Sequence, residues 1–274
     1  PTPQMFCVHC FRHAGCGTAR PFWCDLSVNL LEEKHGRTNL VTGGFLWMTT
    51  LSKRIVRAAL NRAARLYGWL FPGVYNAVSA CRYKGRPHRQ LEIGCGPSRI
   101  DGFETLNIVP AWGVDYVGDA SRRMPFKDGT FDLVYASHVL EHVPWYLVEG
   151  TLREWIRVLR AGGCLEIWVP DGLKICRTLV EAEDDHQDRT HLDGWYKFNP
   201  ERDPCVWAAG RLFTFGDGTG RRDHPNWHRA LFTPQYLERL FVKIGLHDVR
   251  PLGHEEVRGD DHGWINLGVT GRKP

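Results

Sequence analysis

A glycine-containing stretch at residues 90–97 holds the side chains whose types and spacing best suit ligand chemistry. Apolar and polar residues alternate up to Gly94 and Gly96, and Glu92 stands two places before the first glycine. Glycine lets a ligand approach the backbone and leaves N–H groups facing it. The Glu92 carboxylate could bind a cationic group. The stretch therefore predicts a buried strand that ends in a ligand-binding turn.

A second group with chemical potential is His138-Val-Leu-Glu141-His142, which follows a predicted strand at Phe131–Tyr135. The pattern H-x-x-E-H occurs in inverted zinc proteases, where a helix places both imidazoles on one side. The same residues could instead accept a proton from a substrate. We favour the second interpretation, with a capping or core position as the alternative for His142, and we predict no metal ion here.

Composition describes an ordinary globular protein of 274 residues, 43% hydrophobic and 24% charged. No apolar run approaches the roughly 18 residues that a membrane-spanning helix needs. We expect no secretory signal, because the apolar run at residues 6–11 is short and interrupted. Nine cysteines without the spacing of a small disulfide scaffold favour free thiols in a reducing compartment. These features predict a cytoplasmic protein.

Charge divides the chain into a basic front and an acidic body. Residues 1–90 carry 13 Lys/Arg against 3 Asp/Glu, a net charge of +10, whereas residues 91–274 carry 22 against 28, a net charge of −6. The pattern of residues 48–85 predicts a basic amphipathic helix region. The helix is expected to break at residues 68–73, where aromatic residues are expected to be exposed. Residues 51–71 could contact an anionic membrane surface, or the helix could pack on the main domain.

Residues 1–47 lack the periodicity of a packed domain and contain a cysteine cluster. The pair Cys7-x-x-Cys10 could supply half of a zinc site, with the remaining ligands from His9, His13, Cys16 or Cys24. The alternative is a disordered extension. We therefore place the main domain at 86–274.

Strands and helices alternate through the main domain, which predicts an α/β fold with a mostly parallel sheet. Thr233-Pro234 is a typical helix start, Arg160 to Gly163 is expected to end a helix, and residues 183–231 are predicted as a long functional insertion. The predicted strands are Arg89–Ile93, Phe103–Ile108, Val114–Val117, Phe131–Tyr135, Cys164–Val169, His247–Leu252 and Trp264–Thr270, and the predicted helices are Trp145–Leu159, Leu173–Ala182 and Gln235–Ile244.

The motifs in this order resemble class I S-adenosylmethionine-dependent methyltransferases of the type 11 group, over about residues 86–270. They are Leu91-Glu-Ile-Gly-Cys-Gly96, Gly118-Asp-Ala120, Phe126, Phe131-Asp-Leu-Val134, Ser137-His-Val-Leu-Glu-His142 and Arg157-Val-Leu-Arg-Ala-Gly-Gly163. The resemblance implies a Rossmann-like seven-stranded, mostly parallel sheet with helices on both faces and an antiparallel last strand. It implies S-adenosylmethionine as the cofactor.

The resemblance also implies roles for individual residues around that cofactor. The glycine turn would pass under its amino-acid end, Glu92 would contact its ammonium, and Asn107 stands where the family has an acid for the ribose. An acid there is expected to bind the cofactor more tightly, and Asp115 is a candidate substitute. The implied cofactor-binding residues are Glu92, Gly94, Cys95, Gly96, Asn107, Asp119, Ala120 and Ser137, and the candidate catalytic residues are His138 and His142.

Two other interpretations fit less well. A dinucleotide fold would need a third glycine at position 99, which is Arg99, and an acid at the end of the second strand. Nucleic-acid binding would need aromatic residues among the basic ones, and that pattern is missing. Asp171, His191 and His228 are further candidates for a general base.

The sequence thus predicts transfer of a methyl group to an oxygen or nitrogen atom of a small-molecule or glycan-type acceptor. The alternative is a noncatalytic protein of the same fold that binds a partner through its basic front. Oligomeric state does not follow from these features.

Overall fold

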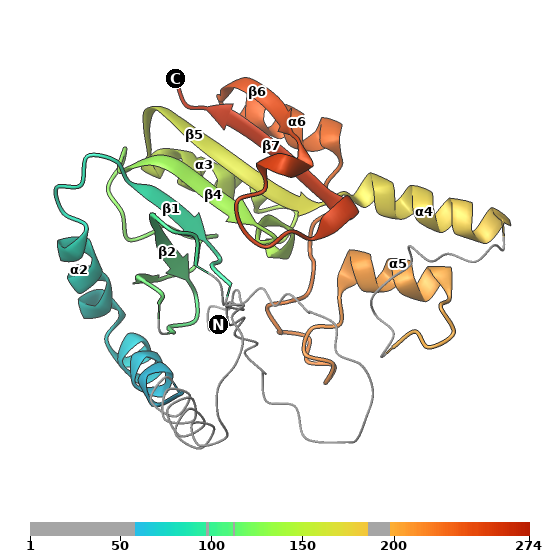
Figure 1. Cartoon of the computed structure of the whole chain (residues 1–274), viewed down its shortest axis with the longest axis horizontal. Coiled ribbons are helices and arrows are strands. Elements are labelled where there is room, and N and C mark those ends of the chain that lie inside the picture. The colour runs from blue at the N-terminus through green and yellow to red at the C-terminus, as the bar shows by residue number, and fades with distance from the viewer. Residues whose placement is uncertain (1–57, 97–98, 112, 186–197) are drawn as a thin grey trace, which may run out of the picture.

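The computed structural model describes residues 58–96, 99–111, 113–185 and 198–274 (Figure 1). The predicted extension at 1–47, with its cysteine cluster, lies outside the described residues. So do the first part of the 48–85 helix region and, within the insertion, residues 186–197, which include His191.

A seven-stranded sheet with the order β3-β2-β1-β4-β5-β7-β6 forms the centre of the molecule (Figure 1). Neighbouring strands from β3 through β5 are parallel, whereas β7 runs antiparallel to both β5 and β6. This confirms the predicted fold class, including the antiparallel last strand. The strands are β1 (Gln90–Ile93), β2 (Phe103–Asn107), β3 (Tyr116–Val117), β4 (Phe131–Ser137), β5 (Leu159–Pro170), β6 (His247–Leu252) and β7 (Asn266–Arg272).

Helices surround the sheet. Residues 58–70 form a helix that precedes α2. The remaining helices are α2 (Pro72–Arg82), α3 (Val148–Val158), α4 (Gly172–Asp185), α5 (Pro204–Phe213) and α6 (Pro234–Lys243), with short 3₁₀ turns at η1 (Leu140–His142), η2 (His254–Glu256) and η3 (Gly263–Ile265). The predicted start of α6 is confirmed, because the Thr233 side chain accepts a hydrogen bond from Tyr236 N and Pro234 is the first helical residue.

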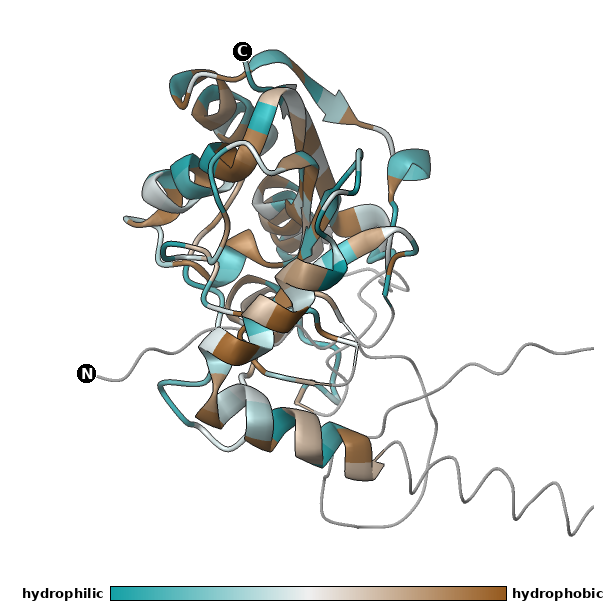
Figure 2. Cartoon of the chain, turned by 90° about the vertical axis from the view of Figure 1, so that its left-hand side faces the viewer, coloured by the Kyte–Doolittle hydropathy of each residue, from teal (hydrophilic) through white to brown (hydrophobic). Residues whose placement is uncertain are grey.

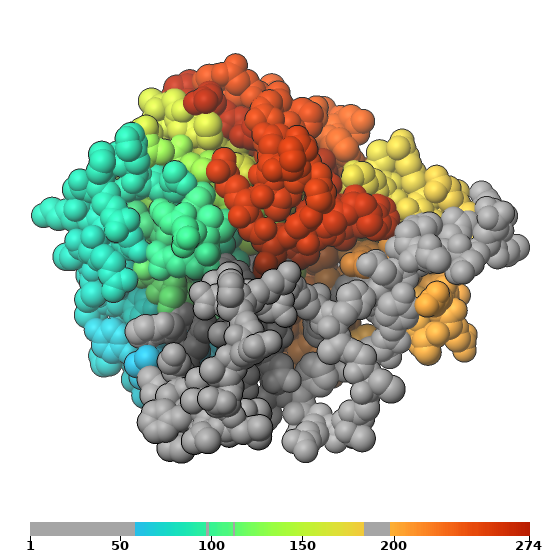
Figure 3. Space-filling model, in the orientation of Figure 1, coloured from blue at the N-terminus to red at the C-terminus, as the bar shows by residue number. Residues whose placement is uncertain are grey.

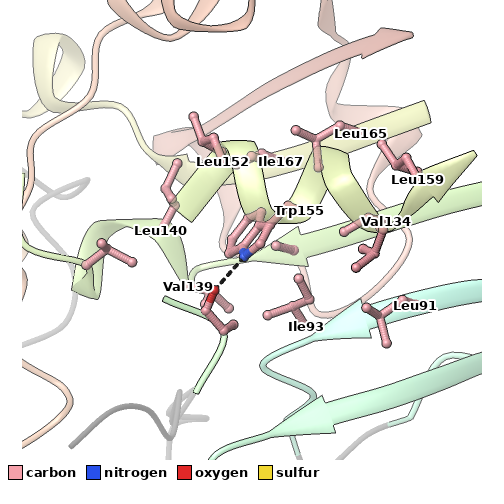
Figure 4. Packing of buried hydrophobic residues seen from close by; sticks show 14 of the residues in the cluster. Leu91, Ile93, Val134, Val139, Leu140, Leu152, Trp155, Leu159, Leu165 and Ile167 are labelled. Atoms are coloured by element: carbon pink, nitrogen blue, oxygen red, sulfur yellow. Dashed lines mark hydrogen bonds between the residues drawn. The ribbon is translucent and has the colours of Figure 1, made fainter. Parts of the chain in front are cut away.

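The main hydrophobic core lies between one face of the sheet and helices α3 and α6. Trp155 of α3 is fully buried in it, and its indole Nε1 donates to Ala120 O at 2.9 Å (Figure 4). Leu91, Ile93 and Val134 reach it from the strands. Because alternate residues of a strand point to opposite faces, Glu92 lies on the other side.

That opposite face of the sheet carries a smaller cluster of Phe103, Leu133, Tyr135 and Trp168. The connection between β6 and β7, residues 253–265, supplies Val257 to this cluster. Figures 1 and 3 show the connection in orange and red on the side turned to the viewer. The link from β1 to β2 is too short for a crossover helix that could cover this face. The β6–β7 connection covers it instead.

The predicted glycine cap at the end of α3 is wrong. The helix ends at Val158, Leu159 is extended with ψ 139°, and the residues up to Gly163 belong to β5. A Cβ at Gly163 would lie 3.1 Å from Asp132 O and 2.9 Å from Arg160 O. Close backbone approach at an irregular strand pairing with β4, not a helix end, therefore explains this glycine.

The insertion predicted at 183–231 contains regular structure, because α5 lies within it. Figure 1 shows α4 and α5 side by side at one end of the molecule. Trp207 of α5 and Ile175 of α4 are fully buried in the cluster between them. Asp203 starts α5 by accepting a hydrogen bond from Val206 N.

Helix α2 closes the β3 edge of the sheet through a side chain. Asn76 Nδ2 donates to Val117 O at 2.9 Å, and Asn76 Oδ1 accepts from Val117 N at 2.8 Å. The amide thus pairs with both backbone groups of the edge strand. Tyr75 Oη adds a hydrogen bond to Val114 O at 2.6 Å.

Replacing Asn76 with alanine should lower the free energy of unfolding by about 1–3 kcal/mol, because it leaves both Val117 groups without their partner. Denaturant unfolding monitored by circular dichroism measures this change. The control Val78→Ala alters a side chain on the same helix that is 58% exposed, and should change stability by less than about 0.5 kcal/mol. Equal effects of the two variants would contradict the role given to Asn76.

Figure 2 shows hydrophobic residues interspersed with polar ones along residues 58–70 and α2. Leu66, Trp69, Leu70 and Phe71 are 53–69% exposed. Among the described residues, no helix combines the length and apolar composition needed to cross a bilayer.

Candidate functional site

The glycine turn lies at the carboxyl end of β1, beside the ends of β2 and β4. Gly94 N donates to Leu106 O at 2.9 Å, and Gly94 has φ +75°, a conformation that side chains disfavour. A Cβ there would overlap Val139 Cγ2, whereas a Cβ at Gly96 would meet only Asp260 Oδ2 at 3.9 Å. The fold itself requires Gly94, and it leaves the space at Gly96 open.

Asn107 holds this turn from the end of β2. Its Nδ2 donates to Cys95 O at 2.9 Å, and its Oδ1 accepts from Val109 N at 3.3 Å. Cys95 is buried, and burial raises the pKa of its thiol to about 12. The amide of Asn107 thus has a structural role that the sequence did not reveal.

This contact reverses the expectation for an acid at position 107. Asn107→Asp would place a carboxylate oxygen against Cys95 O, so that two acceptors face each other in a buried site. We expect lower thermal stability and about tenfold weaker S-adenosylhomocysteine binding. Calorimetry of Asn107→Asp beside the parent chain measures this, and tighter binding by the variant would contradict it.

Asp115 does not substitute for the missing acid, because the fold already uses its carboxylate. It accepts from Arg99 Nη2 at 2.8 Å and from Thr105 N at 3.0 Å. Arg99 also donates to Phe103 O at 2.7 Å. Asp115 and Arg99 therefore join β2 to the link that precedes it.

Glu92 is a buried carboxyl, 6% exposed, on the sheet face covered by the β6–β7 connection. Its Oε2 accepts a hydrogen bond from Ile100 N at 3.3 Å. Burial raises its pKa to about 7, and the charge of Asp260 adds to this, while the Ile100 hydrogen bond and the charge of Arg99 oppose it. A cationic ligand beside Glu92 would stabilise its charged form.

The other predicted cofactor residues follow β3 and β4. Asp119 Oδ1 accepts from Ser121 N at 2.9 Å and from Ser121 Oγ at 2.6 Å. Ala120 is buried, with its carbonyl bound to Trp155. Ser137 is the last residue of β4 and pairs with Trp168 of β5.

His138, the residue after β4, is 6% exposed and has φ +52°, which is uncommon outside glycine. Its Nδ1 lies 3.2 Å from Glu141 Oε1, and its Nε2 lies 2.8 Å from Asn266 Oδ1. Its ring lies against that of His262, with centroids 3.6 Å apart and a tilt of 33°. Both ring nitrogens thus face oxygen atoms.

The β6–β7 connection is therefore part of the site, although its residues were missed at the sequence level. It brings Asp260 to Gly96 and His262 to His138, and Asn266 follows at the start of β7. Burial, and then His138, hold the pKa of His262 at about 3. One sequence feature could have indicated this role. The connection is a polar stretch with two histidines, and it begins where β6 ends, at the edge of the sheet where the parallel strands have their carboxyl ends.

His142 is also buried, but it takes no part in the contacts of His138 with Asn266 and His262. Its Nδ1 lies 3.4 Å from Trp227 O, and burial lowers its pKa, as it does for His228, whose pKa falls to about 4. The helical H-x-x-E-H arrangement of the zinc proteases does not form, because η1 is a single 3₁₀ turn. Glu141 and His142 lie next to His228 instead.

Asp171 has no place in this chemistry. Its Oδ1 accepts from Leu173 N at 2.9 Å and from Lys174 N at 3.1 Å, which is the pattern of a helix N-cap for α4. Its role is structural.

Residues 102–167 match the sequence model of the methyltransferase domain family. The matched range runs from β2 into β5 and contains Asn107, Asp119, Ser137 and His138. The glycine turn lies just before it. The seven-stranded sheet with its antiparallel last strand is the one expected of class I S-adenosylmethionine-dependent methyltransferases. The chain contains a methyltransferase domain. Its cofactor is S-adenosylmethionine, and it is an enzyme of methyl transfer.

The residues present fit that cofactor. It carries an ammonium and a sulfonium, and Glu92 supplies a buried carboxyl at the turn. The open space at Gly96 leaves backbone accessible to its amino-acid end. Glu92 and the glycine turn would hold the cofactor at the carboxyl ends of β1, β2 and β4.

Several solved structures resemble the chain. An S-adenosylmethionine-dependent methyltransferase of Thermotoga maritima, described as a "possible histamine N-methyltransferase", is 17% identical, and the match covers 84% of this chain and 97% of that one, with a TM-score of 0.38. The trans-methyltransferase CalH in complex with S-adenosylhomocysteine is also 17% identical, over 73% of this chain and 55% of CalH, with a TM-score of 0.38. Similarity at this level carries no argument about the acceptor. No curated protein matches the chain significantly.

Proposed function

We propose that the chain methylates an oxygen or nitrogen atom of a small-molecule or glycan-type acceptor. The observation that supports this is His138, buried at the carboxyl end of β4 with Glu141 at its Nδ1 and Asn266 at its Nε2. The cofactor supplies an electrophilic methyl group on a sulfonium. An O–H or N–H acceptor loses a proton as it gains the methyl, and His138 Nε2 accepts that proton once the acceptor takes the place of Asn266.

Glu141 supports this role from the other side of the ring. Its carboxylate lies 3.2 Å from His138 Nδ1, so it favours the neutral tautomer that carries its proton on Nδ1 and has its lone pair on Nε2. Both side chains are buried, which strengthens their interaction and excludes water.

A surface groove supports the acceptor class. It begins three residues after His142 in the chain, and Trp145, Tyr146, Gln235 and Arg239 line it. Trp145 and Tyr146 are 70% and 67% exposed, with ring centroids 5.5 Å apart. Exposed aromatic faces beside polar side chains suit the apolar faces and hydroxyl groups of a sugar. Trp145→Ala should raise KM for the acceptor and leave kcat within about threefold.

Radiolabelled S-adenosylmethionine tests the reaction, with a panel of mono- and oligosaccharides, phenols and amines as acceptors. His138→Asn should lower kcat by about 10²-fold or more and leave S-adenosylhomocysteine affinity within about threefold. Asparagine is chosen because it tolerates positive φ. A methyl group found on carbon or sulfur, or full activity in His138→Asn, would contradict the proposal. Cofactor binding without turnover on any acceptor would favour the noncatalytic alternative.

We also propose a cytoplasmic location with peripheral contact between residues 51–71 and an anionic membrane surface. The exposed Trp69, Leu70 and Phe71 support the contact, as do the exposed Arg62 and Arg65 on the helix that ends just before Phe71. The five described cysteines, all free, are consistent with a reducing compartment. Co-sedimentation with phosphatidylserine vesicles should exceed that with neutral vesicles and fall in a Trp69→Ala/Phe71→Ala variant.

A further inference from the structure

Three side chains with metal-binding atoms meet beside the methyltransferase site. Glu141, His142 and His228 each offer one ligand atom, and these atoms lie within 4.8 Å of one another. Two of the residues belong to η1, and the third comes from the segment before α6, far away in the chain. The rings of His142 and His228 have centroids 5.0 Å apart at an interplanar angle of 68°.

Backbone hydrogen bonds hold these two segments together without any ligand. Arg229 N and Ala230 N both donate to Glu141 O, at 2.7 and 3.1 Å, and Trp145 N donates to Arg229 O at 3.1 Å. His228 directly precedes this pairing. The relative positions of the three side chains are therefore set by the fold.

The Glu141 carboxylate is the group that calls for a ligand. It is 1% exposed, and neither of its oxygens has a hydrogen-bond partner among the described residues. The nearby His138 Nδ1 lies 3.2 Å from Oε1, in a geometry that makes a close ion contact but no hydrogen bond. Buried carboxylates are ordinarily hydrogen-bonded, paired or bound to metal.

His142 has the second contact that metal-binding histidines usually have. Its Nδ1 lies 3.4 Å from Trp227 O, so a proton on Nδ1 points to this carbonyl. In that tautomer the imidazole lone pair is on Nε2. A backbone carbonyl on one ring nitrogen and an ion on the other is the usual arrangement for such ligands.

We propose that Glu141, His142 and His228 bind a divalent transition-metal ion of the zinc class. Two imidazoles and one carboxylate suit Zn²⁺, whereas Mg²⁺ and Ca²⁺ prefer oxygen ligands. Three protein ligands leave a fourth position open. Arg211 lines the same small cavity and would favour water-derived or other anionic ligands there.

The proposed ion differs from the zinc-protease arrangement of the H-x-x-E-H pattern. His138 is not one of the three ligands, and His228 takes its place. Glu141 lies between the ion and His138, the proposed proton acceptor. By binding Glu141, the ion would hold this carboxylate in position beside His138. The site does not depend on the proposed methyl acceptor, and its test uses no methyl transfer.

The test is metal analysis of the full chain, stripped with a chelator, incubated with Zn²⁺ and desalted. We expect one zinc ion per chain bound at this cluster, and a rise in melting temperature on adding Zn²⁺. His228→Ala and the isosteric Glu141→Gln should each weaken zinc affinity by about 100-fold or more. The control His247→Ala, an exposed histidine, should leave it unchanged.

The amino-terminal cysteines require a second measurement, because they could hold zinc independently. In a Cys7→Ser/Cys10→Ser variant, zinc retained at the cluster supports the proposal. Co²⁺ in that variant should show d–d bands without sulfur-to-cobalt charge transfer. Zinc absent from this variant would overturn the proposal, as would zinc affinity that survives both Glu141→Gln and His228→Ala. Circular dichroism of each variant establishes that it is folded.

Discussion

Replacing Gly94 with alanine is expected to destabilise the protein by about 2–5 kcal/mol and to abolish measurable cofactor binding. The φ of +75° disfavours any side chain, and the new methyl group would overlap Val139 Cγ2. Val139 follows His138, so relief of the overlap would move the segment that carries the proposed proton acceptor. Thermal and denaturant unfolding measure the first effect, and calorimetry with S-adenosylhomocysteine measures the second.

Two further variants separate the causes. Adding Val139→Ala to Gly94→Ala should remove the overlap but keep the backbone strain, so the double variant should recover part of the stability lost, less the cost of the smaller core residue. Gly73→Ala is the matched control, because a Cβ there meets no atom within 4 Å. A Gly94→Ala protein as stable as Gly73→Ala would contradict the account of the turn.

Glu92 is expected to make both stability and cofactor affinity depend on pH. Burial raises its pKa from 4.5 to about 7, so the folded protein holds this proton more tightly than the unfolded chain. The stabilising effect of that proton is present below pH 4.5 and is lost as pH rises through about 7. The difference corresponds to about 3 kcal/mol, so Glu92→Gln should be more stable than the parent above pH 7 by roughly this amount.

Cofactor affinity should change in the opposite direction. Below about pH 7 the carboxyl is neutral, and binding an ammonium requires proton release, so affinity should fall by up to tenfold per pH unit. Above about pH 8 the α-amino group of the cofactor loses its own proton, and affinity should fall again. The Glu92→Gln variant should bind the cofactor more weakly than the parent at pH 7.5. Its affinity should also lack the fall below about pH 7, the acidic limb of the profile.

Calorimetry between pH 5.5 and 9 tests this profile, with Asp260→Asn as a companion variant. Asp260 faces Glu92 from the β6–β7 connection, and its charge raises the Glu92 pKa, so its removal should shift the acidic limb to lower pH. The same profile in Glu92→Gln and in the parent chain would exclude Glu92 as the ammonium contact.

Local patterns predicted much of the fold. The alternation of apolar residues predicted β1. The start of α6 was predictable because it depends on Thr233, Pro234 and the nearby Tyr236 N–H alone. The residues around Gly163 were misassigned because the same glycines suit a helix cap and a close approach to β4, and only the tertiary contact with Asp132 distinguishes the two.

The site was less predictable because its contacts join distant segments. The hydrogen bond from Asn107 to Cys95 O connects two strand ends, and no sequence pattern specifies which carbonyl an amide will meet. His262 and Asn266 reach His138 only because the β6–β7 connection crosses the sheet. His228 was named as one candidate base among several, and its nearness to Glu141 follows from a backbone pairing between separate segments.

The central claim, a cofactor site built on the glycine turn, is tested most directly by titrating the full chain and its Gly96→Ala variant with S-adenosylhomocysteine. A Cβ at Gly96 meets only ordinary contact at 3.9 Å, so the variant should be as stable as the parent. We predict one molecule bound per chain, and at least about tenfold weaker binding by Gly96→Ala because the added methyl group occupies space that the ligand needs. No binding by the parent chain, or equal binding by both proteins, would contradict the account.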